Sequence, residues 1–172
     1  MNLKISLLAL LASASVSTSF AADTATMTTP KDNEILSWLI VVNKNEINAA
    51  KETLKRASNP KVKAFAKLMI KDHGKNLKQT ESYDKKFVKT DEVETLQKKG
   101  AEELKKLSAL KGKEYDKAYV EDMVDDHTAA LKTIEGFGTV DNEKINKHLE
   151  ATRKHIEHHL QEAKELQGVV KS

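Results

Sequence analysis

The chain contains only two prolines, and each directly follows a residue that can cap a helix. Thr29 precedes Pro30, and Asn59 precedes Pro60. A Thr or Asn side chain at the N-cap accepts a hydrogen bond from the first turn, and proline at the first helical position loses no intrahelical partner. Both prolines therefore mark helix starts, and no proline interrupts the remaining chain. With six glycines as well, the composition favours long helices and predicts an all-α protein.

Apolar residues at steps of three and four predict four main helices. The first two run from Pro30 to about Ser58 and over about residues 61–89, where Phe87 is expected on the buried face. The other two cover about residues 114–135 and, from a cap at Asp141, reach about Leu166. Because the loops within each pair of helices are short, we expect two antiparallel hairpins.

The segment between the hairpins, residues 90–113, has a weaker apolar pattern that Gly100 and Gly112 interrupt. We expect a partly helical crossover here. At a rise of about 1.5 Å per residue, a segment of roughly 24 residues can return along the whole bundle. The second and third helices should then run parallel. Two antiparallel hairpins joined by one long crossover are the wiring of a ferritin-like four-helix bundle.

The first residues have the pattern of a secretory signal peptide. Lys4 is followed by an apolar run, Ile5 to Ala12, and then by small residues, so we predict cleavage after Ala21. The run is too short for a membrane-spanning helix, which needs about 18 apolar residues. The prediction is a periplasmic or secreted protein without a transmembrane anchor in its mature chain. Its parts are a signal peptide (1–21), a flexible tail (22–29) and one helical-bundle domain (30–168).

The 29 basic and 26 acidic residues are nearly balanced and alternate along the chain without a basic stripe. Few aromatic residues are available to stack on bases, so no nucleic-acid partner is expected. The absence of cysteine excludes disulfides and thiolate metal ligands. Residues 35–42 are apolar all round, which predicts either deep burial or a homodimer contact through the first helix.

One ionisable residue falls on the predicted buried face of each main helix. His73 and His127 end the similar sequences MIKDH and MVDDH, and each stands four residues after a methionine. Glu46 follows Val42 by four residues, and His159 follows Ile156 by three. Buried ionisable groups are usually paired, hydrogen-bonded or bound to metal. Three imidazoles and one carboxylate suit a single divalent ion, with zinc preferred.

Three stretches of the chain resemble a known family. ASNPKVKAFAKLMIKDHGKN, KEYDKAYVEDMVDDHTAALKTIE and HHLQEAKEL are similar to sequences of the bacterial exported family called domain of unknown function 4142. The resemblance covers about Asp32 to Leu166 and implies a ferritin-like bundle, whose activity the family name leaves open. The chain departs from the family where Pro and Arg often precede the last histidine, since Lys154 and Glu157 stand there. The family's polar positions match Glu46, Asp72, His73, Asp116, His127 and His159.

Several versions of the metal site stay open at this point. Asp72, Asp116 or Asp126 could orient an imidazole by a hydrogen bond without touching the ion. His155 and His159, one helical turn apart, could instead form a site nearer the surface.

Copper is a second choice of metal. Met69 with His73, and Met123 with His127, would pair a thioether with an imidazole, which suits copper(I). Methionine is also an ordinary core residue, so zinc is preferred to copper.

Enzymatic activity finds little support in the sequence. No glutamate stands three residues before any of the six histidines, so the Glu-x-x-His motif of di-iron oxidases is missing. The alternative to metal binding is a structural or partner-binding protein of the cell envelope. In that case Glu46, the histidines and the aspartates would form a buried hydrogen-bond network, with Tyr115 or Tyr119 as donors.

Overall fold

The structure, a computed structural model, describes residues 30–83 and 85–171, which form five α-helices and no strand. The prediction of an all-α protein is confirmed. The predicted signal peptide and tail, residues 1–29, lie outside the described residues. The helices are α1 (Pro30–Arg56), α2 (Pro60–Glu81), α3 (Asp91–Ser108), α4 (Gly112–Phe137) and α5 (Glu143–Val170).

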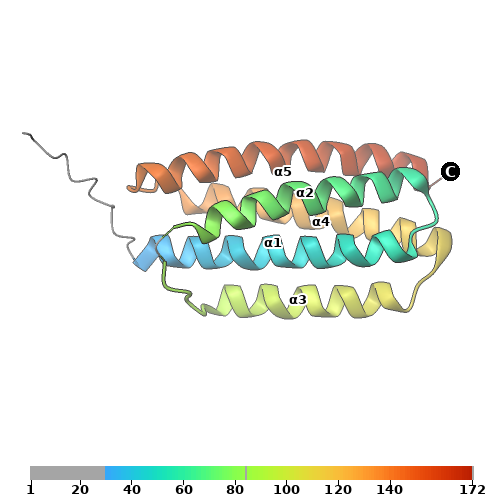
Figure 1. The fold of residues 1–172 in the computed structure, drawn as a ribbon, viewed down its shortest axis with the longest axis horizontal. Helices are drawn as coiled ribbons and strands as arrows, with labels where there is room; N and C mark the ends of the chain where they lie inside the picture. The colour runs from blue at the N-terminus through green and yellow to red at the C-terminus, as the bar shows by residue number, and fades with distance from the viewer. Residues whose placement is uncertain (1–29, 84, 172) are drawn as a thin grey trace, which may run out of the picture.

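The helices lie side by side in one elongated bundle (Figure 1). α1 packs against α2, and α4 packs against α5, each as an antiparallel pair. α3 packs against α1 and carries the chain from one end of the bundle back to the other, so α2 and α4 run in the same direction. Both hairpins and the parallel second and third main helices are therefore as predicted.

Among the described residues, side chains cap three of the helix starts. Asn59 accepts a hydrogen bond from the backbone N–H of Lys61, as predicted, and Pro60 opens α2. Thr90 caps α3 in the same way. The cap of α5 is Asn142 and not the predicted Asp141, because the Asn142 side chain accepts from the N–H of the third helical residue. α5 also continues to Val170, beyond the predicted end near Leu166.

α2 ends at Glu81, about eight residues before the predicted end near Lys89. Side chains of α1 hold the following segment in a non-helical path: Asn33 accepts from the backbone N–H of Lys86 at 2.8 Å, and Ser37 accepts from that of Val88 at 2.9 Å. The prediction for Phe87 is therefore wrong, because Phe87 lies after the helix and is 42% exposed.

Residues 91–108 of the crossover form one helix, α3, so the prediction of a partly helical crossover is confirmed, and Gly100 lies inside this helix. Gly100 is buried because α3 approaches α1 closely there, and a Cβ atom at this position would overlap the side-chain amide of Asn45. That amide donates to the backbone carbonyl of Leu96 at 2.9 Å. The glycine thus allows close helix packing, which sequence periodicity does not reveal.

The core consists of two apolar clusters, one toward each end of the bundle. Residues 35–41 of the apolar run in α1 are all buried and most of them belong to the second cluster, whereas Val42 at the end of the run is partly buried. Deep burial, one of the two predictions for this run, is confirmed. None of the described helices is both long and apolar enough to span a membrane.

Candidate metal centre

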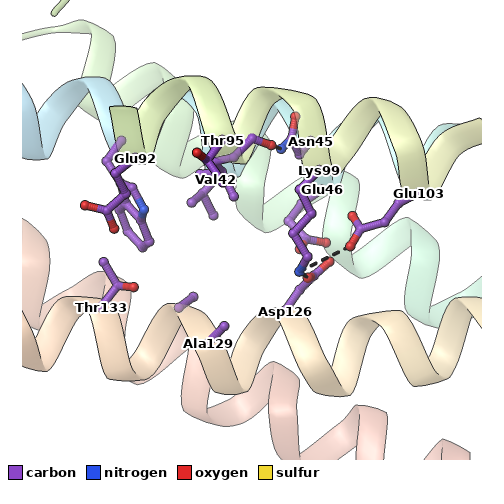
Figure 2. Close-up of a pocket in the computed structure, with 13 residues that line it drawn as sticks. Val42, Asn45, Glu46, Glu92, Thr95, Lys99, Glu103, Asp126, Ala129 and Thr133 are labelled. Atoms are coloured by element: carbon purple, nitrogen blue, oxygen red, sulfur yellow. Dashed lines mark hydrogen bonds and ion pairs between the residues drawn. The ribbon is translucent and has the colours of Figure 1, made fainter. Parts of the chain in front are cut away.

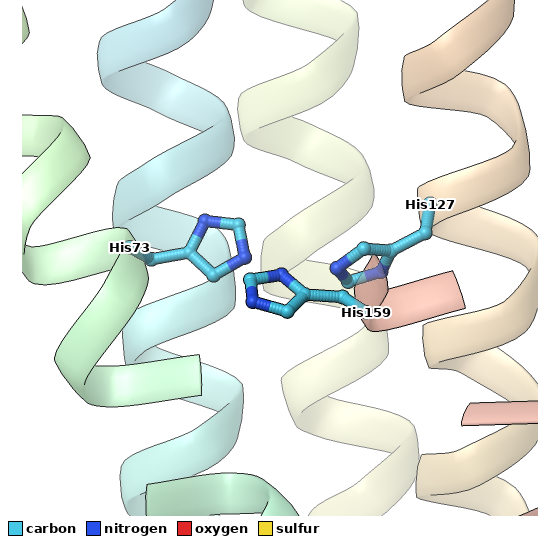
Figure 3. A group of neighbouring side chains, drawn as sticks. All are labelled: His73, His127 and His159. Carbon is cyan, nitrogen blue, oxygen red and sulfur yellow. The ribbon is translucent and has the colours of Figure 1, made fainter. Parts of the chain in front are cut away.

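Three histidines from three different helices meet between the two apolar clusters (Figure 3). His73 comes from α2, His127 from α4 and His159 from α5. One ring nitrogen of each lies within 4.8 Å of one ring nitrogen of both others. The ring centroids are 5.3 to 5.7 Å apart. We call these three residues the histidine triad.

The triad is almost completely shielded from solvent. His73, His127 and His159 are 5%, 2% and 1% exposed. A small cavity of about 10 Å³ adjoins His73 and His159. A space of this size holds about one water molecule at most.

A hydrogen bond fixes the protonation of His73. Its Nδ1 lies 3.0 Å from Oδ1 of Asn43. The Nδ2 of Asn43 donates to the backbone carbonyl of Leu39 at 2.7 Å and to Oδ1 of Asn76 at 2.8 Å. Because the amide nitrogen has these two acceptors, Oδ1 of Asn43 must accept, and Nδ1 of His73 must carry the proton. The Nε2 atom of His73 is therefore a bare acceptor.

The same reasoning applies to the other two rings. Nδ1 of His127 donates to the backbone carbonyl of Met123 at 2.8 Å, which leaves Nε2 without a proton. Nε2 of His159 donates to Oδ2 of Asp72 at 3.3 Å, which leaves Nδ1 without a proton. A histidine that binds metal commonly donates its other N–H to a carboxylate or carbonyl in this way.

The three remaining nitrogens are buried and have no hydrogen-bond partner. They are Nε2 of His73, Nε2 of His127 and Nδ1 of His159. All three carry lone pairs, so they cannot hydrogen-bond to one another. An unsatisfied buried polar atom costs about 1 to 3 kcal/mol. The triad therefore presents three inward lone pairs, which either a metal ion or hydrogen-bond donors could satisfy.

Burial keeps the three imidazoles neutral. It lowers the pKa of His127 to about 3 and lowers the pKa of His73 well below its ordinary value, and in His73 the neighbouring rings add to this effect. Burial also lowers the pKa of His159, although Asp72 acts in the opposite direction. Only neutral imidazole binds a metal ion, so the rings are in the ligating form at neutral pH.

Glu46 is not part of the triad. Its side chain on α1 is 5% exposed and lines a different cavity, beside Lys99, Glu103 and Asp126. No group of potential ligands among the described residues joins Glu46 to the histidines. Burial raises the pKa of Glu46 well above its ordinary value, and the Asp126 and Glu103 carboxylates raise it further.

The aspartates expected around the imidazoles have different surroundings. Asp72 lies against His159, as described above. Asp126 forms an ion pair with Lys99 of α3. Asp116 accepts from the backbone N–H groups of Ser58 and Asn59 at 3.0 and 2.8 Å, so it fixes the loop between α1 and α2. Of the three, Asp72 is the one whose carboxylate reaches a triad ring.

The surface pair proposed as an alternative shares a residue with the triad. Asp72, His155 and His159 each offer an atom within 4.8 Å of the others, and His155 is exposed. Because His159 belongs to both groups and its Nε2 faces Asp72, a metal ion in one group competes with the other for that ring.

The methionines of the repeated motif pack into the core. Met69 and Met123 are 0% and 1% exposed and belong to the first apolar cluster. Tyr115 is one of the donors expected for a polar network. Its hydroxyl oxygen lies 3.0 Å from Oγ1 of Thr53, so its hydrogen-bond partner is a threonine and not a triad ring.

Asn43 is the residue of this site that the sequence analysis missed. It follows Leu39 by four residues, so it shares the buried face of α1, and it is 1% exposed. The signal for Asn43 in the sequence is a polar residue at a position that helical spacing places on the apolar face of the helix. Helical spacing also places Val42 on this turn of the apolar face, but Val42 is only partly buried.

Comparisons with known proteins agree with this architecture. A search of curated proteins found no match. Among solved structures, a DUF305 protein from Streptomyces coelicolor, inferred to be secreted, is similar with a TM-score of 0.65 and 17% sequence identity. The match covers 80% of this chain and 91% of that chain, and at this identity it supports the fold alone.

The family comparison covers more of the chain. The model of the family described as domain of unknown function (DUF4142) matches residues 17–166, which include every helix except the last turn of α5. The resemblance noted from the sequence is thereby confirmed, and the chain belongs to the DUF4142 family.

Proposed function

We propose that this protein is an exported bundle with ferritin-like wiring that binds one divalent metal ion through His73, His127 and His159. The observation that carries the proposal is the set of three buried ring nitrogens without hydrogen-bond partners. Zinc is the preferred ion because neutral imidazole is a good zinc ligand and the chain has no cysteine. Zinc–nitrogen distances of about 2.0 to 2.1 Å require small rotations of the rings toward one point.

A bridging water satisfies the triad less well than a metal ion does. Water has two protons, so it can donate to two of the three lone pairs and leaves the third unsatisfied. That third atom would still cost about 1 to 3 kcal/mol. One metal ion accepts all three lone pairs, and the carboxylate of Asp72 beside His159 offsets part of its charge.

Three protein ligands leave a coordination position open. Structural zinc sites usually have four protein ligands, whereas catalytic sites have three and hold water in the fourth position. A zinc ion bound here would lower the pKa of a water molecule beside it. The cavity that adjoins His73 and His159 is about 10 Å³, which is room for a water molecule and not for a larger substrate.

Elemental analysis of the untagged mature protein tests the proposal. We expect about one zinc per chain in the parent, and less than a tenth of that in His73→Ala and His127→Ala, because two ligands cannot hold the ion tightly. His158→Ala is the matched control, since His158 is exposed on the same helix as His159. Copper in place of zinc would change the identity of the metal and leave the ligands unchanged.

The opposite result would support the structural alternative. If the purified parent holds no metal after incubation with zinc or copper, and both alanine variants are merely less stable, the triad is a packing feature.

The intact mass of the same preparation, made in a secreting bacterial host, should correspond to a chain that begins at Ala22. A mass that includes Met1 would contradict the proposal of export.

A further inference from the structure

A second cavity, separate from the triad, lies between α1, α3 and α4 (Figure 2). Its volume is about 180 Å³, much larger than the space beside the histidines. Trp38, Val42 and Leu96 provide part of an apolar wall, and Ala129 and Ala130 continue it on α4. The other end is polar. One cavity therefore combines a hydrocarbon surface with a cluster of charged groups.

The charged end contains more acidic groups than basic ones. Glu46, Glu103 and Asp126 line it together with a single ammonium group, that of Lys99. Lys99 forms ion pairs with Asp126 and with Glu103, the latter at 3.2 Å. Because one ammonium faces three carboxyl groups, the site has unused capacity for positive charge. The position of Lys99 also shows that this acidic end accommodates an alkylammonium group.

Glu46 is the acidic group that Lys99 leaves without a partner. Its Oε2 atom is buried and has no hydrogen bond, and the residue is 5% exposed. Figure 2 shows the Glu46 side chain at the polar end of the cavity, beside Lys99 and Asp126. A buried carboxyl oxygen without a partner is rare in folded proteins and calls for a ligand, a water or an ion. This orphan atom is an observation separate from the partly buried carboxyl groups of Glu103 and Asp126 beside it.

We propose that this cavity binds a small organic cation, a primary amine with a short hydrocarbon chain, whose ammonium group pairs with Glu46. The hydrocarbon chain lies against Trp38 and Val42. The ammonium donates to Oε2 of Glu46, which satisfies the orphan acceptor and offsets the cost of an ionised buried carboxylate. An anionic ligand is disfavoured because it would face the same carboxylates. The site is distinct from the histidine triad and does not depend on a bound metal.

The tryptophan makes the proposal directly measurable. Trp38 is the one tryptophan of the sequence and lines the cavity, so its fluorescence reports on a ligand there. We would titrate the full mature protein with n-butylamine, and in parallel with 1-butanol and butyrate, which have similar hydrocarbon chains and no positive charge. We expect saturable quenching by n-butylamine with a Kd at least about tenfold lower than that of 1-butanol, and no saturable change with butyrate.

Two variants locate the binding site. Glu46→Gln keeps the side-chain shape and cannot ionise to pair with the ammonium, so the affinity for n-butylamine should fall at least about tenfold. Glu102→Gln on α3 is the control, since Glu102 is exposed and pairs with Lys98 outside the cavity, and its affinity should match that of the parent. Equal affinities of the parent for n-butylamine and 1-butanol would overturn the proposal, and so would a folded Glu46→Gln variant that binds like the parent.

Discussion

At the scale of single residues, the histidines of this chain differ because of the groups that their two nitrogens meet. In the triad, one nitrogen donates to a protein acceptor and the other has no partner. His148 is also buried, at 7% exposed, but its Nε2 lies 2.9 Å from Oγ1 of Thr80. The Thr80 hydroxyl donates to the carbonyl of Asn76 at 2.8 Å, so it must accept from His148. His148 is thus a structural histidine with a satisfied donor.

His148 should make the stability of the protein depend on pH. Burial lowers the pKa of His148 below its ordinary value, so the unfolded chain binds a proton first as the pH falls below about 6.5. The contribution of His148 to stability is therefore complete above about pH 6.5 and is lost below it. His148→Gln should unfold with a free energy lower by on the order of 1 kcal/mol at about pH 7.5, and the difference from the parent should shrink toward about pH 5.

Urea unfolding of the metal-free protein at several pH values measures this difference. His158→Gln, an exposed position on the same helix, is the control and should follow the parent throughout. A difference between His148→Gln and the parent that stays constant or grows on acidification would contradict the assignment.

The residues of the triad could be predicted from helical spacing because each follows an apolar neighbour on its own helix by three or four positions. The spacing does not predict the rotation of α1, which directs Glu46 toward α3 and α4 instead of toward the three rings. It also does not predict which aspartate reaches a ring, because Asp72, Asp116 and Asp126 look alike in the sequence. Their partners belong to distant parts of the chain, at Lys99 and in the loop at Ser58.

At the scale of helices, two features that the sequence does not predict lie where α1 makes tertiary contacts. The helical pattern of α2 continues past Glu81, but Asn33 and Ser37 bind the backbone of residues 86 and 88 and stop the helix earlier. Gly100 interrupts the apolar pattern of α3, but the helix continues through it, and the side chain of Asn45 from α1 lies where a Cβ atom would be. Helix starts are easier to predict because a cap depends on neighbouring residues in the sequence, although the cap of α5 is one residue later than predicted.

Gly100→Ala should destabilise the protein, although alanine is the better helix former. Alanine gains about 0.8 to 1 kcal/mol over glycine inside a helix. Its Cβ atom would overlap the Asn45 amide, which would have to move and lose its hydrogen bond to the carbonyl of Leu96. We expect a net loss of about 1 to 2 kcal/mol in the free energy of unfolding, measured in urea.

Gly74→Ala is the matched control within α2. Outside the backbone of its own helix, no atom lies within 4 Å of a Cβ atom built at Gly74, so this change should stabilise the protein by up to about 1 kcal/mol. If both variants gain stability equally, the close approach of α3 to α1 at Gly100 is not tight.

At the scale of the whole molecule, the histidine triad links the two hairpins. His73 belongs to the α1–α2 hairpin, whereas His127 and His159 belong to the α4–α5 hairpin. Apolar clusters pack on both sides of this polar layer. A metal ion held by the triad would therefore join the two halves of the bundle, which are otherwise connected through α3 and side-chain packing.

Zinc should consequently raise the thermal stability of the entire bundle. A ligand that binds only the folded state stabilises it by about 2.7 kcal/mol at a free concentration of one hundred times its Kd. For a domain of this size, about 1 kcal/mol corresponds to roughly 2 to 4 °C, so we expect Tm to rise by about 5 to 10 °C. EDTA should reverse the increase, and His127→Ala should show none of it because the link between the hairpins is lost. Calorimetry and far-UV circular dichroism should report the same shift, since both hairpins unfold together. An equal increase in Tm in the parent and in His127→Ala would place the zinc outside the triad. No increase in Tm in either protein would contradict zinc binding to the folded bundle.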